Sequence, residues 1–300
     1  MTGMHGLSAE REDRKRRLAG ALAVTIAGLV LELAGGLYAR SLALLADATH
    51  LFADIAALIL AYAAMNLADR APTGKHTFGF SRAEVLAAFV NAQLLFVLAL
   101  YICWEAVQRF RDPVAVRTGV MLAVALAGLA ANLVAMRLLA PARDKSLNMR
   151  AAYVEVLMDT FGSVGVVAAA VAIPRTGWSW LDPAVSGVIA AMILPRAVSL
   201  LKQSAHILLE GAPGEVDLGA LRRRILEVPG VEELHDVHFW TLTSGVHSAS
   251  LHIRASGDRS RLQVLQAVQA VLREEAGVDH ATIQVEWEPE TACRSRPEHA

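Results

Sequence analysis

The sequence predicts an α-helical membrane protein with six transmembrane helices, followed by a smaller α+β domain. Two features of the 300 residues lead to this fold class. Hydrophobic residues make up 55% of the chain, too many for a soluble globular protein, and they concentrate in long runs before Leu201. Beyond Leu201 the chain changes to shorter amphipathic segments and alternating strands. We therefore predict a membrane domain over residues 1–205, an α+β domain over 206–290 and a disordered tail over 291–300.

The membrane domain is predicted from six apolar windows. A transmembrane helix needs about 20 apolar residues to cross about 30 Å of hydrocarbon. Windows that meet this length lie at residues 18–38, 43–66, 83–106, 118–139, 152–173 and 181–201. An even number of spans places both termini on one side, and Lys and Arg are enriched in the segments on that side. We therefore expect a multi-pass protein of a bacterial-type inner (plasma) membrane, with both termini and the α+β domain in the cytoplasm.

The α+β domain is predicted from a change of hydrophobic period. Helical patterns lie near residues 217–227 and 261–275, and alternating patterns lie at 231–243, 247–255 and 280–288. The order αββαβ is typical of a small two-layer domain, in which helices cover one face of a sheet.

Composition and motifs exclude several classes of protein. Cys103 and Cys293 are the only cysteines, so the chain has neither a disulfide framework nor a thiolate metal cluster. Residues from Ala205 onward include 15 acidic and 9 basic side chains, which argues against nucleic acid as a partner. HExxH, CxxC, GxSxG and Walker sequences are absent, so we expect neither an enzyme nor a catalytic cofactor.

Two apolar windows carry ionisable residues at matching positions. His50 and Asp54 lie four residues apart in the second window, and Glu155 and Asp159 lie four residues apart in the fifth. Residues i and i+4 share one face of a helix, with Cβ atoms about 5 to 6 Å apart. Two such faces turned toward each other would form a cage of four ligands.

The cost of burying these groups supports a cation site. A carboxylate at the centre of a membrane helix costs about 2.5 to 3.5 kcal/mol, so three of them together cost on the order of 8 to 10 kcal/mol. This is comparable to the stability of a whole domain. A bound divalent cation or shared protons would compensate, whereas the alternative is a set of interhelical hydrogen bonds or a wet vestibule. Asp47 and Glu32 are further buried acids, for which we expect a supporting role around the site or a place on a proton path.

Histidines outside the spans suggest further cation sites. His235 and His252 come from different predicted strands and can meet, and Glu286 of the last strand completes a mixed nitrogen and oxygen site. His76, in the loop between the second and third spans, is a candidate ligand at the cytoplasmic mouth. The alternative for all these residues is that they are solvated surface side chains.

Five motifs carry a resemblance to a known family. They are SLALLADATHLFAD, HTFGFSRAEVLAAFVNA, YVEVLMDTFGSVGV, LLEGAP and HDVHFWTLTSG, in this order. With them the chain resembles the cation diffusion facilitator family over about residues 17–288, particularly its cobalt-zinc-cadmium efflux branch. The resemblance implies a homodimer of six-helix protomers with a ferredoxin-like or metallochaperone-like cytoplasmic domain, which exchanges a divalent metal for protons. It also implies a transport site at His50, Asp54, Glu155 and Asp159.

The chain departs from this family at two places. Many zinc-transporting relatives have histidine where this chain has Glu155, so a divalent ion bound here would leave a formal charge of −1. We hypothesise that one carboxylate, such as that of Glu155, keeps a proton while metal is bound. In the soluble domain, Gln284 and Glu286 stand where relatives have histidine and aspartate, and glutamine is a poor ligand.

We therefore expect proton-coupled efflux of Zn²⁺ or similar divalent cations, including cobalt and cadmium, from the cytoplasm. The alternative from another class is a membrane-anchored metal sensor or binding protein, in which the spans serve only as an anchor. Such a protein would not need paired ionisable residues deep in two helices.

Overall fold

The computed structural model describes residues 2–68, 70–142, 147–243, 245–256, 260–278 and 280–286. The predicted tail over 291–300 lies outside these residues. The described residues fall into two compact units, one within Met1–Ile59 and Val90–Leu200 and the other within Leu60–Phe89 and Leu201–Ala300. The domain boundaries at residues 205 and 290 stay predictions.

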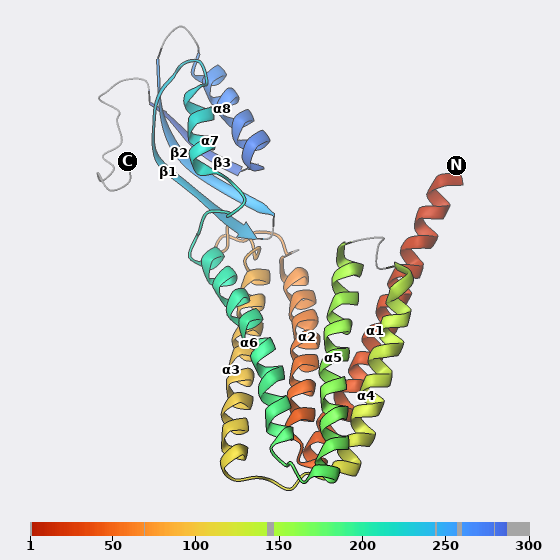
Figure 1. Ribbon diagram of the computed structural model, residues 1–300. Coiled ribbons are helices and arrows are strands. Elements are labelled where there is room, and N and C mark those ends of the chain that lie inside the picture. The colour runs from red at the N-terminus through yellow and green to blue at the C-terminus, as the bar shows by residue number, and fades with distance from the viewer. Residues whose placement is uncertain are drawn as a thin grey trace. The chain divides into compact units, whose positions relative to one another are not determined.

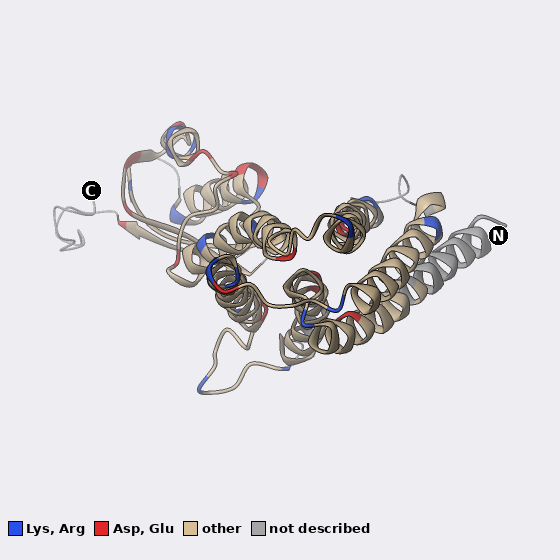
Figure 2. Ribbon diagram, turned by 60° about the horizontal axis from the view of Figure 1, so that its bottom comes forward, with Lys and Arg blue, Asp and Glu red and all other residues tan. Residues whose placement is uncertain are grey.

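The described part of the chain contains six helices that are long and apolar enough to cross a membrane, which confirms the predicted number. Figure 1 labels these helices, and Figure 2 marks the charged residues of their described parts. They are α1 Thr2–Ala39, α2 Leu42–Ala68, α3 Ala83–Arg111, α4 Thr118–Leu139, α5 Leu147–Thr176 and α6 Leu181–Leu208. A short 3-10 helix, η1 Ala140–Ala142, follows α4.

Helices α1, α4 and α5 lie side by side, with α4 in contact with both of the others. Small residues permit this close approach, as is common between membrane helices. A Cβ added at Gly35 of α1 would meet a side-chain carbon of Val124 at 2.5 Å, and one added at Gly128 of α4 would overlap the carboxylate of Glu32. Asn132 of α4 donates a hydrogen bond to Ser163 of α5 at 3.1 Å. The packing of α1 on α4 therefore leaves no room for a side chain at Gly35 unless Val124 moves.

The C-terminal segment forms the predicted αββαβ order. Its elements are α7 Leu218–Leu226, β1 Val231–Thr243, β2 Val246–Ala255, α8 Arg261–Ala276 and β3 His280–Glu286. In the described part of this segment the strand order is β1-β2-β3, antiparallel between β1 and β2 and parallel between β2 and β3. Helices α7 and α8 contact each other and lie on one face of the sheet (Figure 1).

The core of this α+β layer forms where apolar residues of the strands meet the helices. Leu251 and Ile253 of β2 and Val264 and Leu272 of α8 are almost fully buried. Helix α8 begins at a capping box, in which Ser260 accepts a hydrogen bond from the backbone of Gln263. The sheet face opposite the helices carries polar residues of β1, β2 and β3.

Candidate metal centres

His50 joins the two membrane helices that carry the paired ionisable residues. Its Nε2 lies 3.1 Å from Oδ1 of Asp159 on α5, and its Nδ1 lies 3.4 Å from Oδ2 of Asp54 on its own helix. Asp159 is only 5% exposed. The structure thus places His50 in contact with two of the other predicted ligands, Asp54 on its own helix, as expected from the i, i+4 spacing, and Asp159 across on α5.

Glu155 has a different neighbour, the guanidinium of Arg196 on α6. Nη2 of Arg196 lies 2.6 Å from Oε1 of Glu155 and 3.9 Å from Oδ1 of Asp54. In the sequence, Arg196 counts only as one of the Lys and Arg residues enriched on the predicted cytoplasmic side. Its position within the sixth apolar window, directly after Pro195, was the available signal for a functional role.

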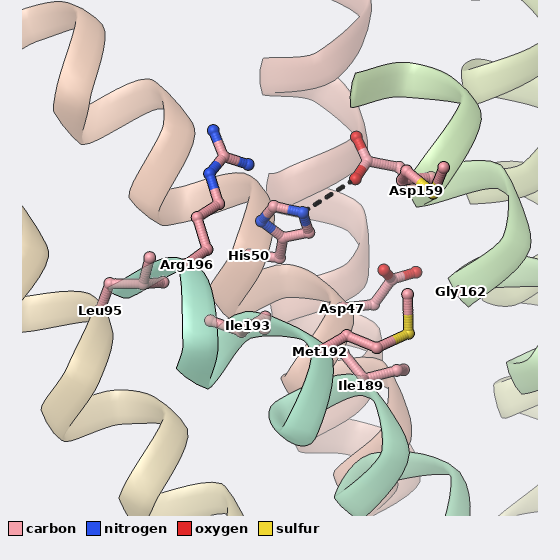
Figure 3. Close-up of a pocket in the computed structure, with 10 residues that line it drawn as sticks. Asp47, His50, Leu95, Asp159, Gly162, Ile189, Met192, Ile193 and Arg196 are labelled. Atoms are coloured by element: carbon pink, nitrogen blue, oxygen red, sulfur yellow. Dashed lines mark ion pairs between the residues drawn. The ribbon is translucent and has the colours of Figure 1, made fainter. Parts of the chain in front are cut away.

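A cavity of about 270 Å³ lies beside His50 and Asp159. Figure 3 shows Arg196 on one side of His50 and Asp159 on the other, with Asp47 lower in the view. Residues of α2, α3, α5 and α6 line it: Asp47, His50, Leu95, Met158, Asp159, Gly162, Ile189, Met192, Ile193 and Arg196. The ionisable side chains of Asp47, His50, Asp159 and Arg196 therefore line one partly polar cavity among the membrane helices.

Asp47 and Glu32 are two further buried acids of the membrane unit, and Asp47 lines this cavity. Asp47 is buried and accepts a hydrogen bond from the hydroxyl of Ser163 at 3.1 Å, and Ser163 in turn accepts one from Asn132. Glu32 is 1% exposed and rests against Gly128, and its Oε2 has no hydrogen-bond partner among the described residues. Asp47 therefore belongs to a chain of polar groups next to the predicted ligands, and the role of both acids on a proton path stays a prediction.

The second group of candidate ligands lies on the sheet of the α+β segment. His235 of β1 and His252 of β2 are paired across the strands, and both contact Glu286 of β3. Nδ1 of His252 lies 3.2 Å from Oε1 of Glu286, and Nε2 of His235 lies 3.5 Å from Oε2. Within the described chain, these residues form the one group of His, Cys, Asp or Glu whose ligand atoms all lie within 4.8 Å of one another.

Gln284 and Asp236 complete the surroundings of this group. The amide of Gln284 donates a hydrogen bond to Oε1 of Glu286 at 3.1 Å, so it supports the carboxylate and does not compete with it. Asp236 has a positive φ of 51° where the pairing of β1 with β2 shifts register. Its Oδ2 lies 3.7 Å from Nε2 of His252. Sequence reasoning missed Asp236, because strand parity does not reveal an irregularity in the strand.

His76 lies apart from the other candidate ligands. It pairs with Thr73 in a tight turn, where the backbone groups of the two residues exchange hydrogen bonds of 3.0 Å. Its ring packs on Phe80, with 4.6 Å between the ring centroids. A cation site at His76 stays a prediction, and the turn supplies a structural role for the residue.

Both groups offer donors that divalent metals accept. Imidazole nitrogen and carboxylate oxygen are ligands of zinc, and oxygen donors admit cobalt and cadmium as well. Glu286 is buried, and two histidines and the amide of Gln284 surround its carboxylate. A bound cation fits here because it would compensate the negative charge, which is costly to bury. The membrane group differs in taking its candidate ligands from two helices, α2 and α5, and in lying next to a fixed positive charge, Arg196 of α6.

Two family models match the chain. The model of the cation efflux transmembrane domain matches residues 18–209, and that of the cation efflux protein cytoplasmic domain matches residues 213–288. These ranges contain both groups of candidate ligands.

Similar proteins match most of the chain. The metal cation efflux system protein CzcD of Cupriavidus metallidurans is 43% identical over 276 residues, which are 92% of this chain and 87% of CzcD. The zinc transporter ZitB of Escherichia coli is 42% identical over 280 residues, which are 93% of this chain and 89% of ZitB. A cadmium, cobalt and zinc/H(+)-K(+) antiporter of Bacillus velezensis is 36% identical over 263 residues, which are 86% of this chain and 84% of the antiporter.

Among solved structures, the metal-bound C-terminal domain of the CzcD transporter from Cupriavidus metallidurans is 36% identical to the matching part of this chain. The match covers 24% of this chain and 99% of that domain, with a TM-score of 0.23.

Proposed function

Because the chain belongs to the cation efflux family, also called the cation diffusion facilitator family, we propose that it exports zinc and related divalent cations from the cytoplasm in exchange for protons. The names of the relatives support zinc, cobalt and cadmium as cargo, and the name of the Bacillus velezensis antiporter supports proton exchange. The relatives are transporters, so we expect no enzymatic activity and no catalytic cofactor.

The contact between His50 and Asp159 is the observation that carries this proposal. It joins a nitrogen donor of α2 to an oxygen donor of α5 at 3.1 Å, next to a cavity inside a membrane unit. Carboxylates at such a position are costly, and a passing divalent cation compensates for their charge. A protein that used its spans only as an anchor would have no need of this contact.

Transport would follow from competition for the same atoms. We propose that the cargo ion enters from the cytoplasm and binds to His50, Asp54, Glu155 and Asp159. A proton that binds to an imidazole nitrogen or a carboxylate oxygen occupies the lone pair that the metal needs, so protons arriving from the far side favour release. Rocking of helix groups around the site would expose it to each side in turn.

The proposed assembly is a homodimer in a bacterial-type plasma membrane, with both termini in the cytoplasm. The match of residues 213–288 to a cytoplasmic domain model supports the location of the α+β segment. The excess of Lys and Arg in the segments on the same side supports the placement of the termini. The bilayer, the cargo ion and the protons are then the partners of the chain, besides its second copy.

Proteoliposomes that contain the purified protein and a zinc-sensitive dye test the function. We expect zinc to accumulate when the lumen is more acidic than the outside, because protons that leave the vesicle drive zinc inward. A protonophore should stop this accumulation. Zinc binding without flux would support the membrane-anchored sensor instead, and flux that ignores the gradient would overturn proton exchange.

We also propose a cytoplasmic cation site at His235, His252 and Glu286. Glu286→Gln keeps the shape of the side chain but removes the charge, so we expect the full-length protein to bind about one metal ion fewer per chain. Equilibrium dialysis followed by metal analysis measures this number. Glu274→Gln, at an exposed position of α8, is the matched control. An unchanged metal content in folded Glu286→Gln would show that this group does not bind the ion.

A further inference from the structure

A fixed positive charge lies among the candidate ligands of the membrane site. Nη2 of Arg196 lies 2.6 Å from Oε1 of Glu155 on α5 and 3.9 Å from Oδ1 of Asp54 on α2. An arginine side chain stays protonated throughout the physiological pH range. The charge of Arg196 is therefore permanent, in contrast to that of a histidine or a carboxylic acid.

Arg196 interacts with the same oxygen atoms that a metal ion would use. A cation bound to Glu155 and Asp54 needs oxygen lone pairs of both carboxylates, and the guanidinium already lies against one oxygen of Glu155. Two positive charges a few ångströms apart in a partly dehydrated site repel each other strongly. The metal and the guanidinium are thus competitors for Glu155 and, at longer range, for Asp54.

The side chain of Arg196 is free to give way to a metal ion. It is 50% exposed, whereas Asp159 on the opposite side of His50 is buried. A long, half-exposed arginine can withdraw its charged group toward water while its apolar stem stays on the helix surface. Displacement therefore does not require α6 to unfold or leave the membrane unit.

Arg196 also changes the charge balance of the site. With His50 neutral, the three carboxylates Asp54, Glu155 and Asp159 carry a formal charge of −3, and nearby Arg196 reduces it to −2. Arg196 therefore balances part of the carboxylate charge while the site holds no metal. A divalent ion that displaces the guanidinium takes over this role, and the proton on Glu155 that we expect from the sequence then balances the remaining charge.

We propose that Arg196 is a tethered cation that holds Glu155 and Asp54 in the metal-free site and that the arriving metal displaces from these carboxylates. The inference rests on the proposed transport function and identifies the group that sets the affinity of the same site. Competition from Arg196 weakens metal binding and so favours release. Its return to the carboxylates after release prepares the site for the next ion.

Metal affinity of the full-length protein in detergent tests this role, measured for Cd²⁺ and Zn²⁺ by competition with a fluorescent chelator. Arg196→Gln removes the competing charge, so we expect binding to become about tenfold tighter. Arg196→Met removes the same charge, keeps an apolar stem and provides a second variant in case Arg196→Gln does not fold. Arg196→Lys keeps a cation and should stay within about threefold of the unaltered protein.

Lys202→Gln is the matched control, because Lys202 is an exposed cation on the same helix. This change should leave the affinity unaltered. In vesicles, Arg196→Gln should lower both the KM for zinc and the maximal rate of uptake, since tighter binding slows release. A merely structural ion pair between α5 and α6 would lower the thermal stability without this combined change.

Unchanged or weaker metal binding by folded Arg196→Gln or Arg196→Met would overturn the proposal. Failure of the unaltered protein to bind or transport metal would remove the proposed function itself. The two failures are therefore distinguishable in one set of titrations.

Discussion

Asp159→Asn should abolish zinc uptake by proteoliposomes, with a fall in the initial rate of more than about 100-fold. Asp159 is 5% exposed and lies 3.1 Å from Nε2 of His50 across two helices. The amide has almost the same shape as the carboxylate, but it lacks the negative charge that a divalent ion requires. The initial rate of dye response under an imposed pH gradient measures this loss.

Asp112→Asn is the control for this experiment. Asp112 follows the end of α3 and is exposed, so loss of its charge should leave the uptake of zinc unchanged. Asp54→Asn should resemble Asp159→Asn, because Asp54 contacts the other ring nitrogen of His50 at 3.4 Å. If folded Asp159→Asn carries zinc at the rate of the unaltered protein, the proposed transport site is wrong.

The elements of the fold could be predicted from local patterns in the sequence. Six apolar windows of sufficient length became the six helices of the described chain that can cross a membrane. The alternating pattern at residues 231–243 became β1 with the same bounds. Such elements are predictable because the hydrophobic period of a segment decides which face it can bury.

Contacts within one helix could be predicted for the site, whereas contacts between helices could only be inferred from family resemblance. The four-residue spacing from His50 to Asp54 fixes their proximity, and the structure gives 3.4 Å between them. The position of Arg196 against Glu155 depends on how α6 packs beside α5, and no spacing within the sequence encodes this arrangement. For this reason the sequence predicted an uncompensated negative charge at Glu155, whereas the structure places the guanidinium of Arg196 beside it.

Local sequence patterns also could not predict the irregular backbone at Asp236 or the capping of a helix by a residue far away in the sequence. Asp236 reaches His252 only because β1 changes register at that residue. Asp182 lies in the first turn of α6. Its carboxylate, however, has its main partners on another helix, at the beginning of α2.

Asp182→Ala should destabilise the membrane unit by about 3 to 5 kcal/mol, the usual cost of removing one partner from a buried charged network. The carboxylate of Asp182 is fully buried and accepts hydrogen bonds from Ser41 Oγ at 2.6 Å and from the backbone nitrogen of Leu42 at 2.8 Å. It also accepts from the backbone nitrogen of Ala43, at 3.2 Å, and lies 3.7 Å from Nη1 of Arg109. A carboxylate at a helix N-terminus satisfies amide groups that have no partner inside the helix and interacts favourably with the helix dipole.

Loss of this cap should show as a lower unfolding temperature of the detergent-solubilised protein. Asp182→Asn keeps one oxygen acceptor and should fall between Asp182→Ala and the unaltered chain. Asp112→Ala removes an exposed carboxylate and should change the stability by less than about 0.5 kcal/mol. Because α2 begins at Leu42 and carries His50 two turns later, a loose N-terminus would also displace the imidazole from Asp159. Equal unfolding temperatures for Asp182→Ala and Asp112→Ala would mean that α2 does not depend on this carboxylate, and the position of His50 would need another cause.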